Sequence, residues 1–355
     1  MLDGPSPWPW SFSPWSFSPW SLSPWSLSPW SFRADRFPRM SHLDVSNVTK
    51  RYGDTVAVDD VSFDAEPGRI LGLLGPNGAG KTSTIRMITY IAVPDAGTVR
   101  YDGRTVGPWS QQRMGYLPEE SGLYKRLEVK EQLVYLGTLK GLSEQDAAER
   151  AHHWLDRFDA TDWADLNIEE LSKGMQQKVQ FIATLLHDPS LLIFDEPFSG
   201  LDPINADLLR DIILELRRDD RTILFASHRM EQVEQLCDDI CLMADGEVVL
   251  HGNLRDIKQQ FGRNTLVLEF DGPDTFVDDL AGAGRVRVNT RSAHRAELTL
   301  ADGTDARAVL DVALDRTDEL YRYERVEPPL NEIFVDTVGE AEAQRMQQPP
   351  AASAA

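Results

Sequence analysis

The sequence predicts an α/β fold: a mainly parallel sheet with an antiparallel β lobe, a helical subdomain and a small C-terminal α+β domain. Three observations lead to this prediction. Apolar runs such as LLIFDEP from Leu191 and RTILFASH from Arg221 are typical of buried strands, and their alternation with helical segments favours a parallel sheet. A glycine-rich loop at 72–83, GLLGPNGAGKTS, joins one apolar strand to a helix. Near Gly262 the alternation gives way to short strands and two helices.

Residues 1–39 precede this pattern and differ from it in composition. Residues 11–30 are four copies of a pentapeptide, SFSPW twice and SLSPW twice, and the copies carry no charge. Such a low-complexity repeat predicts disorder, and it lacks the basic segment and the continuous apolar core of a secretory signal. We interpret residues 1–39 as repetitive DNA translated upstream of the true start, for which Met40 is the candidate. The alternative is a membrane-surface or aggregation role for the repeated tryptophans.

The globular pattern begins after Met40. Residues 43–75 alternate β-branched and polar side chains, with breaks at Gly53 and Gly68. This pattern predicts antiparallel strands that lead into the strand before the glycine-rich loop. The residues after the loop predict a helix over 81–91.

A helical region and a change of domain follow. Residues 126–187 are predicted to be helical. We predict one domain over 40–262 and a small α+β domain over 263–340, which includes the amphipathic helix PLNEIFVDTV. The tail over 341–355 is predicted to be disordered.

Composition limits the functions that the chain can have. No run of 18 apolar residues exists, so no transmembrane helix is predicted. The net charge is −21, with 35 Asp, 22 Glu, 28 Arg and 8 Lys, and the acidic residues are spread along the chain. This balance resembles that of proteins from halophilic cells, in which molar salt screens the repulsion between like charges. Nucleic acid is a poor partner for such a surface.

The two cysteines, Cys237 and Cys241, are too few for a disulfide framework. Their spacing of four positions is compatible with metal binding, but no cluster of His or Cys lies nearby in the sequence. We expect buried free thiols, which suit a reducing cytosol.

The glycine-rich loop is predicted to bind phosphate. Gly75, Gly80, Lys81 and Thr82 match the P-loop spacing G-x-x-x-x-G-K-[ST] between a strand and a helix. Such glycines let successive backbone N–H groups point inward and form an anion site at the helix N-terminus. Lys81 is expected to reach the β- and γ-phosphates, and the Thr82 hydroxyl to ligate Mg²⁺. The residues expected to line the phosphate are Gly75, Pro76, Asn77, Gly78, Ala79, Gly80, Lys81, Thr82 and Ser83.

Two acidic residues end the apolar strand LLIFDEP. Asp195 lies at its C-terminal end, where a carboxylate can hold Mg²⁺. Glu196 follows it and can polarise an attacking water as a general base. The alternative is that both residues only terminate the strand.

The stretch LSKGMQQ at 171–177 resembles the LSGGQ signature of ABC ATPases. Ser172 and Gly174 match the signature, whereas Lys173 and Met175 depart from it. In that family the signature loop caps the γ-phosphate of the ATP bound by the opposite subunit. The resemblance implies this role for Ser172 and Gly174.

Four further positions match the family in order. Tyr52 matches the aromatic residue that stacks on adenine, and Asp202, in SGLD, matches the D-loop residue at the dimer interface. His228 matches the switch histidine that contacts the γ-phosphate. Glu119 stands where the family has its Q-loop glutamine, which implies a position near the metal. The alternative is that Glu119 points to solvent and that Glu120 or nothing replaces the glutamine.

The resemblance covers residues 43 to about 262, and it implies an ATP-binding and ATP-hydrolysing subunit of an ABC transporter. The implied cofactors are ATP and Mg²⁺. The implied partners are an integral membrane permease and a second ATP-binding subunit, as a homodimer, at the cytoplasmic face of the cell membrane. The segments GYLPEESGLY and LNEIFVDTVG are similar to the sodium-extrusion (NatA-like) branch, which implies an exporter.

Two other classes of P-loop protein are disfavoured. Soluble ABC ATPases of DNA repair carry a long coiled coil between the P-loop and the signature, but only about 90 residues without heptads separate Lys81 from Ser172. Those of translation carry two ATPase domains in one chain, whereas this chain has one. A P-loop GTPase is disfavoured because the chain lacks a guanine-reading N/T-K-x-D motif after the P-loop.

Overall fold

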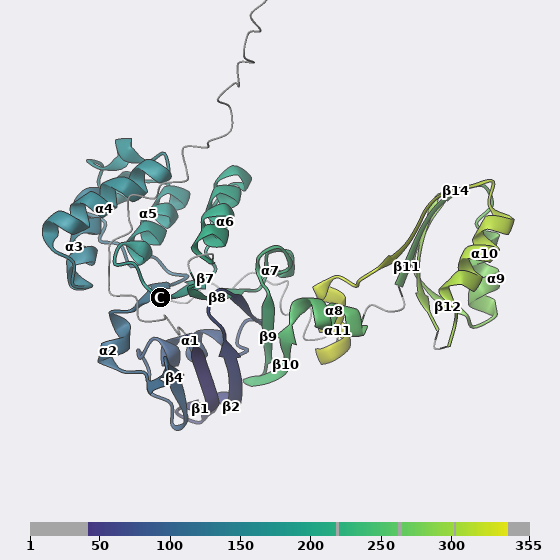
Figure 1. The fold of residues 1–355 in the computed structure, drawn as a ribbon, viewed down its shortest axis with the longest axis horizontal. Helices are drawn as coiled ribbons and strands as arrows, with labels where there is room; N and C mark the ends of the chain where they lie inside the picture. The colour runs from purple at the N-terminus through teal and green to yellow at the C-terminus, as the bar shows by residue number, and fades with distance from the viewer. Residues whose placement is uncertain (1–41, 218–219, 262–264, 302, 340–355) are drawn as a thin grey trace, which may run out of the picture. The chain divides into compact units, whose positions relative to one another are not determined.

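The computed structural model describes residues 42–217, 220–261, 265–301 and 303–339. The repeat segment 1–39, the candidate start at Met40 and the tail 341–355 lie outside the described residues. Within the described residues the fold is α/β, as predicted, and contains three sheets (Figure 1).

The largest sheet is mainly parallel. Its described strands have the spatial order β10 (Glu247–Asn253), β9 (Asp239–Ala244), β3 (Ile70–Leu74), β8 (Thr222–Ser227), β7 (Leu191–Asp195) and β6 (Met114–Leu117). Strands β9, β3, β8, β7 and β6 run parallel, and β10 is antiparallel to β9. Every residue of β3, β7 and β8 is buried, which explains why these strands are continuous apolar runs in the sequence.

An antiparallel sheet lies beside helix α1 (Lys81–Ile88), which follows the P-loop (Figure 1). Its spatial order is β2 (Thr55–Ala65), β1 (Leu43–Tyr52), β4 (Ala96–Tyr101) and β5 (Arg104–Thr105), which confirms the antiparallel strands expected in this region. Val58 of this sheet and Leu73 of β3 belong to one buried apolar cluster with Ile85 of α1. The helix that follows the P-loop is therefore held between the two sheets.

Helix α1 ends earlier than the sequence pattern predicts. The prediction extended to Ile91, whereas the helix ends at Ile88 with Thr89 as its C-cap. Tyr90 adopts a left-handed conformation with φ of 57°, which an α-helix cannot continue through. The apolar character of Ile91 misled the prediction, because this side chain is exposed rather than part of a buried helical face.

The helical subdomain follows β6, as predicted for 126–187. Its helices are α3 (Val129–Leu139), α4 (Glu144–Arg157) and α5 (Lys173–Leu185), with short 3₁₀ turns at Thr161–Trp163 and Ile168–Glu170. The Phe181 ring of α5 stacks on Phe194 of β7 at 4.9 Å between ring centroids. This contact fixes the subdomain to the strand that carries Asp195. The other helices up to residue 261 are α2 (Pro108–Gln111), α6 (Pro203–Arg217), α7 (Met230–Leu236) and α8 (Leu254–Phe261).

Residues 265–301 and 303–326 form a lobe with its own apolar core. Its sheet has the order β12 (Val286–Ser292), β13 (Arg295–Leu300), β11 (Thr265–Asp271) and β14 (Glu319–Val326), with helices α9 (Thr275–Gly282) and α10 (Ala306–Arg316). Phe270 of β11 packs edge-on against Phe276 of α9 at 5.0 Å between ring centroids. Short strands and two helices were expected after residue 262; in the described residues from 265 to 339 there are four strands and three helices.

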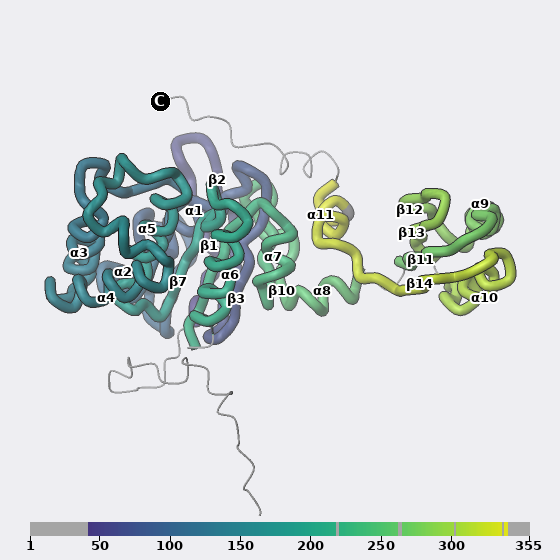
Figure 2. Tube along the Cα trace, turned by 90° about the horizontal axis from the view of Figure 1, so that it is seen from above, coloured from purple at the N-terminus to yellow at the C-terminus, as the bar shows by residue number. Residues whose placement is uncertain are grey.

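The last described helix, α11 (Leu330–Val338), packs against helix α7. The sequence interpretation placed it in the small C-terminal domain, but its Leu330, Ile333 and Phe334 are buried in the apolar cluster that contains Val233 and Leu236 of α7. The N–H of Leu330 also donates a hydrogen bond to Glu234 of α7. Figure 2 shows α11 close to α8, with which it is in contact. None of the helices in the described ranges has the length and hydrophobicity of a membrane-spanning segment.

Candidate functional site

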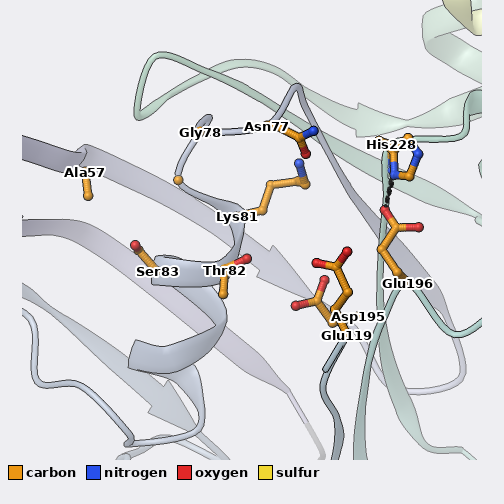
Figure 3. A pocket seen from close by; sticks show the side chains of 11 residues that line it. Ala57, Asn77, Gly78, Lys81, Thr82, Ser83, Glu119, Asp195, Glu196 and His228 are labelled. Atoms are coloured by element: carbon orange, nitrogen blue, oxygen red, sulfur yellow. Dashed lines mark hydrogen bonds and ion pairs between the residues drawn. The ribbon is translucent and has the colours of Figure 1, made fainter. Parts of the chain in front are cut away.

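A cavity of about 340 Å³ opens where the P-loop meets the carboxyl ends of β7 and β8 (Figure 3). We call it the P-loop cavity. Its lining residues are Ala57, Asn77, Gly78, Gly80, Lys81, Thr82, Ser83, Glu119, Asp195, Glu196 and His228. The carboxyl ends of parallel strands are the usual ligand-binding edge of an α/β sheet, because loops and helix N-termini converge there.

The P-loop has the backbone form of an anion site. Gly75, Gly78 and Gly80 have positive φ angles of 146°, 90° and 97°, which curl the loop around the start of α1. The Nζ of Lys81 donates to the carbonyl oxygens of Gly75 at 2.5 Å and Pro76 at 3.0 Å. Burial lowers the pKa of Lys81, and the carboxylates of the cavity oppose this shift. The carbonyl oxygens that the ammonium group contacts are neutral. Negatively charged phosphate oxygens would form stronger hydrogen bonds with it.

Three carboxylates gather opposite Lys81. Asp195 is only 4% exposed. Burial, followed by the negative charges of Glu196 and Glu119, raises the pKa of Asp195 to about 7. Figure 3 shows Glu119 beside Asp195, so Glu119 faces the cavity, while Glu120 does not line it.

The segment around Glu119 is held by the signature helix α5. The side-chain amide of Gln180 donates to the carbonyl of Pro118 at 3.0 Å and to that of Glu120 at 3.3 Å. Gln180 is 6% exposed, so these bonds lie inside the fold. The carbonyls on both sides of Glu119 are thereby fixed to α5.

Glu196 and His228 form a hydrogen-bonded pair. The Oε1 of Glu196 lies 2.6 Å from Nδ1 of His228 and accepts the backbone N–H of His228 at 2.7 Å (Figure 3). The hydrogen bond to Glu196 raises the pKa of His228. Glu196 has a φ of 49°, a strained conformation for this residue type. The two side chains come from the ends of β7 and β8, which pair as neighbours.

The residues matched to the signature and the D-loop lie elsewhere. A second cavity of about 330 Å³, which we call the signature cavity, is lined by Trp163, Ser172, Lys173, Gly174, Met175, Lys178, Gly200, Asp202 and Asn205. The Ser172 hydroxyl caps α5 by accepting the N–H of Met175 at 3.3 Å. The two cavities share no lining residue, so one chain does not bring Ser172, Gly174 or Asp202 to its own P-loop.

Some predicted contacts lie outside both linings. Gly75, Pro76 and Ala79 shape the P-loop without lining its cavity, and Tyr52 is 44% exposed at the end of β1. Ala57 lines the P-loop cavity from β2 and was not expected there from the sequence. No sequence signal marks Ala57, because only the pairing of the two sheets brings it there.

Comparison with known proteins gives the family. The ABC transporter family model matches residues 58–199, and the model described as "ATP-binding protein DrrA1-3-like, C-terminal domain" matches 252–338. The uncharacterized ABC transporter ATP-binding protein YhaQ of Bacillus subtilis is 41% identical over 297 residues, covering 84% of this chain and 98% of its own. The ABC transporter ATP-binding protein NatA of the same organism is 42% identical, over 57% of this chain and 83% of NatA.

Two further likenesses agree. The Nod factor export ATP-binding protein I of Burkholderia lata is 36% identical, over 67% of this chain and 80% of its own. A solved structure of an ATP-binding subunit of an ABC transporter aligns with a TM-score of 0.59 at 33% identity, covering 62% of this chain and 93% of that one. The match to YhaQ covers nearly the whole of that relative, and the P-loop cavity and the acidic end of β7 agree with it. The chain therefore belongs to the ABC transporter ATP-binding proteins and is an ATPase.

Proposed function

We propose that two copies of this chain bind two ATP molecules between them and use the hydrolysis cycle to drive a separate membrane permease in the export direction. The separation of the P-loop cavity from the signature cavity carries this proposal. The P-loop cavity holds the P-loop and the acidic strand end, and the signature cavity holds the signature and D-loop residues. The family uses both groups of motifs around one nucleotide. A second copy with its signature cavity against the first copy's P-loop would complete two sites at once, which is a closed twofold arrangement.

The P-loop cavity supplies the phosphate contacts in this proposal. The backbone of 75–83 and the Lys81 ammonium bind the β- and γ-phosphates. Tyr52 stacks on the adenine, a contact worth roughly 1–3 kcal/mol. Ser172, Gly174 and Asp202 of the second copy close the site over the γ-phosphate.

The acidic side of the cavity fits Mg²⁺. Thr82, Asp195 and Glu119 offer oxygen donors. The pKa of Asp195 is raised first by burial and then by the charges of Glu196 and Glu119, and a divalent cation would offset the negative charge gathered here. Within the described residues, no three His, Cys, Asp or Glu side chains converge on one metal position. This donor set suits Mg²⁺, which is usually held by one or two protein oxygens together with water and phosphate oxygens. Bound Mg²⁺ would neutralise charge on the phosphates.

Glu196 is the proposed general base. Its carboxylate lies in the same cavity as Lys81 and is held by the backbone and ring of His228. It would accept a proton from the attacking water, while His228 contacts the γ-phosphate. Both residues come from ends of adjacent inner strands, so their spacing is rigid.

We propose the partner, the transport direction and the location on the basis of the likeness to the relatives. The likeness to the Nod factor export protein supports the export direction, and the likeness to NatA supports a place in the NatA-like branch. We place the chain at the cytoplasmic face of the membrane, attached through the permease. The ATP-binding domain is proposed over 40–262, with the small domain after it.

The dimer is tested at Ser172, which offers a matched pair of substitutions. Asp and Asn both cap helices as well as Ser, so both variants should keep α5 intact. Ser172→Asp would place a carboxylate against the γ-phosphate of the other copy and should prevent ATP-driven dimerisation, whereas Ser172→Asn should still dimerise. Light scattering with ATP, in a hydrolysis-deficient Glu196→Gln background, measures the outcome. If Ser172→Asp dimerises as well as Ser172→Asn, the signature cavity does not face the nucleotide of a second copy.

Glu119 gives a second prediction, on Mg²⁺. Its carboxylate adds a negative charge next to Asp195, which favours the metal and repels the γ-phosphate. Glu119→Gln should therefore retain ATPase activity and raise the Mg²⁺ concentration for half-maximal rate a few-fold. Glu119→Ala should uncouple ATPase activity from the reconstituted permease while leaving nucleotide binding nearly intact.

Titrations of ATPase rate against Mg²⁺, with and without the permease, measure both Glu119 effects. Glu120→Gln is the control, because this neighbouring carboxylate does not line the cavity. A Glu119→Ala variant that matches wild type in both conditions would exclude Glu119 as the Q-loop residue.

The acidic composition gives a third prediction. Residues 1–39 carry a net charge of +1, which leaves −22 on residues 40–355. Repulsion between these charges should lower stability at low ionic strength, so the melting temperature should rise between about 0.1 M and about 2 M KCl, where the Debye length falls to a few Å. Sucrose, which does not screen charge, is the control. Equal melting temperatures at the two salt concentrations would exclude a halophilic adaptation.

A further inference from the structure

Ser227, the last residue of β8, lies between the proposed base and helix α7. Its side chain is fully buried. The Oγ atom lies 3.1 Å from Oε2 of Glu196 and 3.2 Å from Oε1 of Gln232 on α7. It also accepts the backbone N–H of Arg229 at 3.1 Å. A small buried hydroxyl therefore connects the cavity to the helix behind it.

The Ser227 hydroxyl has fewer protons than it has acceptors within reach. A serine hydroxyl has one proton to donate. Here two oxygen acceptors, on Glu196 and Gln232, are within hydrogen-bond distance of the same Oγ. With the amide of Gln232 oriented as here, so that its Oε1 faces Ser227, only one of the two acceptors can receive the proton at a time, and Gln232 competes with Glu196 for it.

The two oxygens of Glu196 are held differently. Oε1 has both His228 contacts, from the backbone N–H and from Nδ1. Among the described residues, Ser227 provides the hydrogen bond recorded for Oε2. The rotation of the carboxylate about its last bond therefore depends on the hydroxyl of Ser227.

Helix α7 is itself fixed from its far side. Glu234, two positions after Gln232, accepts the N–H of Leu330 and lies 3.2 Å from Nζ of Lys258. Because Gln232 lies on α7, the distance between its Oε1 and the Ser227 hydroxyl depends on the position of α7.

We propose that Ser227 is a positioning residue that orients the Glu196 carboxylate, and that Gln232 weakens this hold by competing for the hydroxyl proton. The inference rests on the proposed role of Glu196 as base. Ser227 touches neither ATP nor water in this scheme. Its effect is on kcat, because it sets the direction of the base, and not on the binding of ATP.

The test measures kcat and KM for ATP in the full chain. Ser227→Ala should lower kcat about tenfold with KM unchanged, and Ser227→Thr, which restores a hydroxyl, should return kcat to within about threefold of wild type. Gln232→Met leaves the proton to Glu196 alone and should raise kcat about twofold. In the Ser227→Ala background the same Gln232→Met change should have no effect, since the shared proton is gone.

Melting temperatures of all variants accompany the kinetics. If Ser227→Ala fails to fold, the Ser227→Thr and Gln232→Met results decide. Wild-type kcat in folded Ser227→Ala, a loss expressed only in KM, or an equal Gln232→Met effect in both backgrounds would each overturn the proposal. Glu196→Gln distinguishes a failure of the proposed base from a failure of the role of Ser227. If Glu196→Gln hydrolyses ATP normally, the assignment of Glu196 as base fails. If Glu196→Gln is inactive and Ser227→Ala is unaffected, only the role of Ser227 is overturned.

Discussion

Glu196→Gln is expected to lower the steady-state ATPase rate by about 10²- to 10⁴-fold, the usual contribution of a general base. The substitution keeps the shape of the side chain and an oxygen that can accept the N–H of His228, which now lies 2.7 Å from Oε1. It removes the group that takes the proton from water. The Lys81 side of the cavity is unchanged, so ATP binding should persist.

A stalled variant should accumulate the ATP-bound dimer. Because closure in the proposed scheme requires ATP and opening requires hydrolysis, Glu196→Gln should elute as a dimer with ATP and as a monomer with ADP. Size exclusion with light scattering measures this. Glu120→Gln, the same chemical change at a carboxylate outside the cavity lining, should behave as wild type in both assays. Hydrolysis by Glu196→Gln at the wild-type rate would remove Glu196 from the mechanism.

The centre of the site was predictable because its motifs are local. Lys81 and Thr82 follow a buried strand and begin a helix, so the loop geometry follows from a short stretch of sequence. Glu196 and His228 are distant in sequence, but each directly follows an inner strand. Parallel strands present their carboxyl ends at one edge, so both residues are expected at that edge, and the family resemblance adds that His228 belongs to the site.

Other features depend on long-range packing that a single sequence does not encode locally. The apolar face of α11 shows that something covers it, but not that α7 covers it rather than the neighbouring lobe. Ala57 enters the cavity only through the position of the antiparallel sheet beside α1. The roles of Ser227 and Gln232 depend on distances of 3.1 and 3.2 Å, which no spacing rule predicts.

The P-loop backbone gives the second large effect, at Gly75. A Cβ atom at this position would lie 2.2 Å from the backbone oxygen of Met243 on β9 and 3.0 Å from Cβ of Ala79. Its φ of 146° is also one that L side chains rarely adopt. Gly75→Ala must therefore displace the loop or β9, since a backbone oxygen cannot rotate away as a side chain can.

Displacement of the loop should cost most of the affinity for ATP. The inward N–H groups act as a set, and each hydrogen bond to a charged phosphate is worth about 1.5–3 kcal/mol. Loss of two such bonds corresponds to a Kd increase of at least about 100-fold. Fluorescence titration with a nucleotide analogue measures Kd, and circular dichroism checks that the variant is folded.

Gly103→Ala separates the clash from the cost of backbone strain. Gly103 also has a positive φ, 73°, but a Cβ there would meet nothing within 4 Å. That variant should lose about 1–3 kcal/mol of stability through strain alone and keep its affinity for ATP. Gly75→Ala should lose both, because its added methyl group meets the strand that fixes the loop. A displaced loop should raise the Kd for ATP by at least about 100-fold. If Gly75→Ala folds and its Kd stays within about threefold of wild type, ATP binding does not depend on this conformation of the loop.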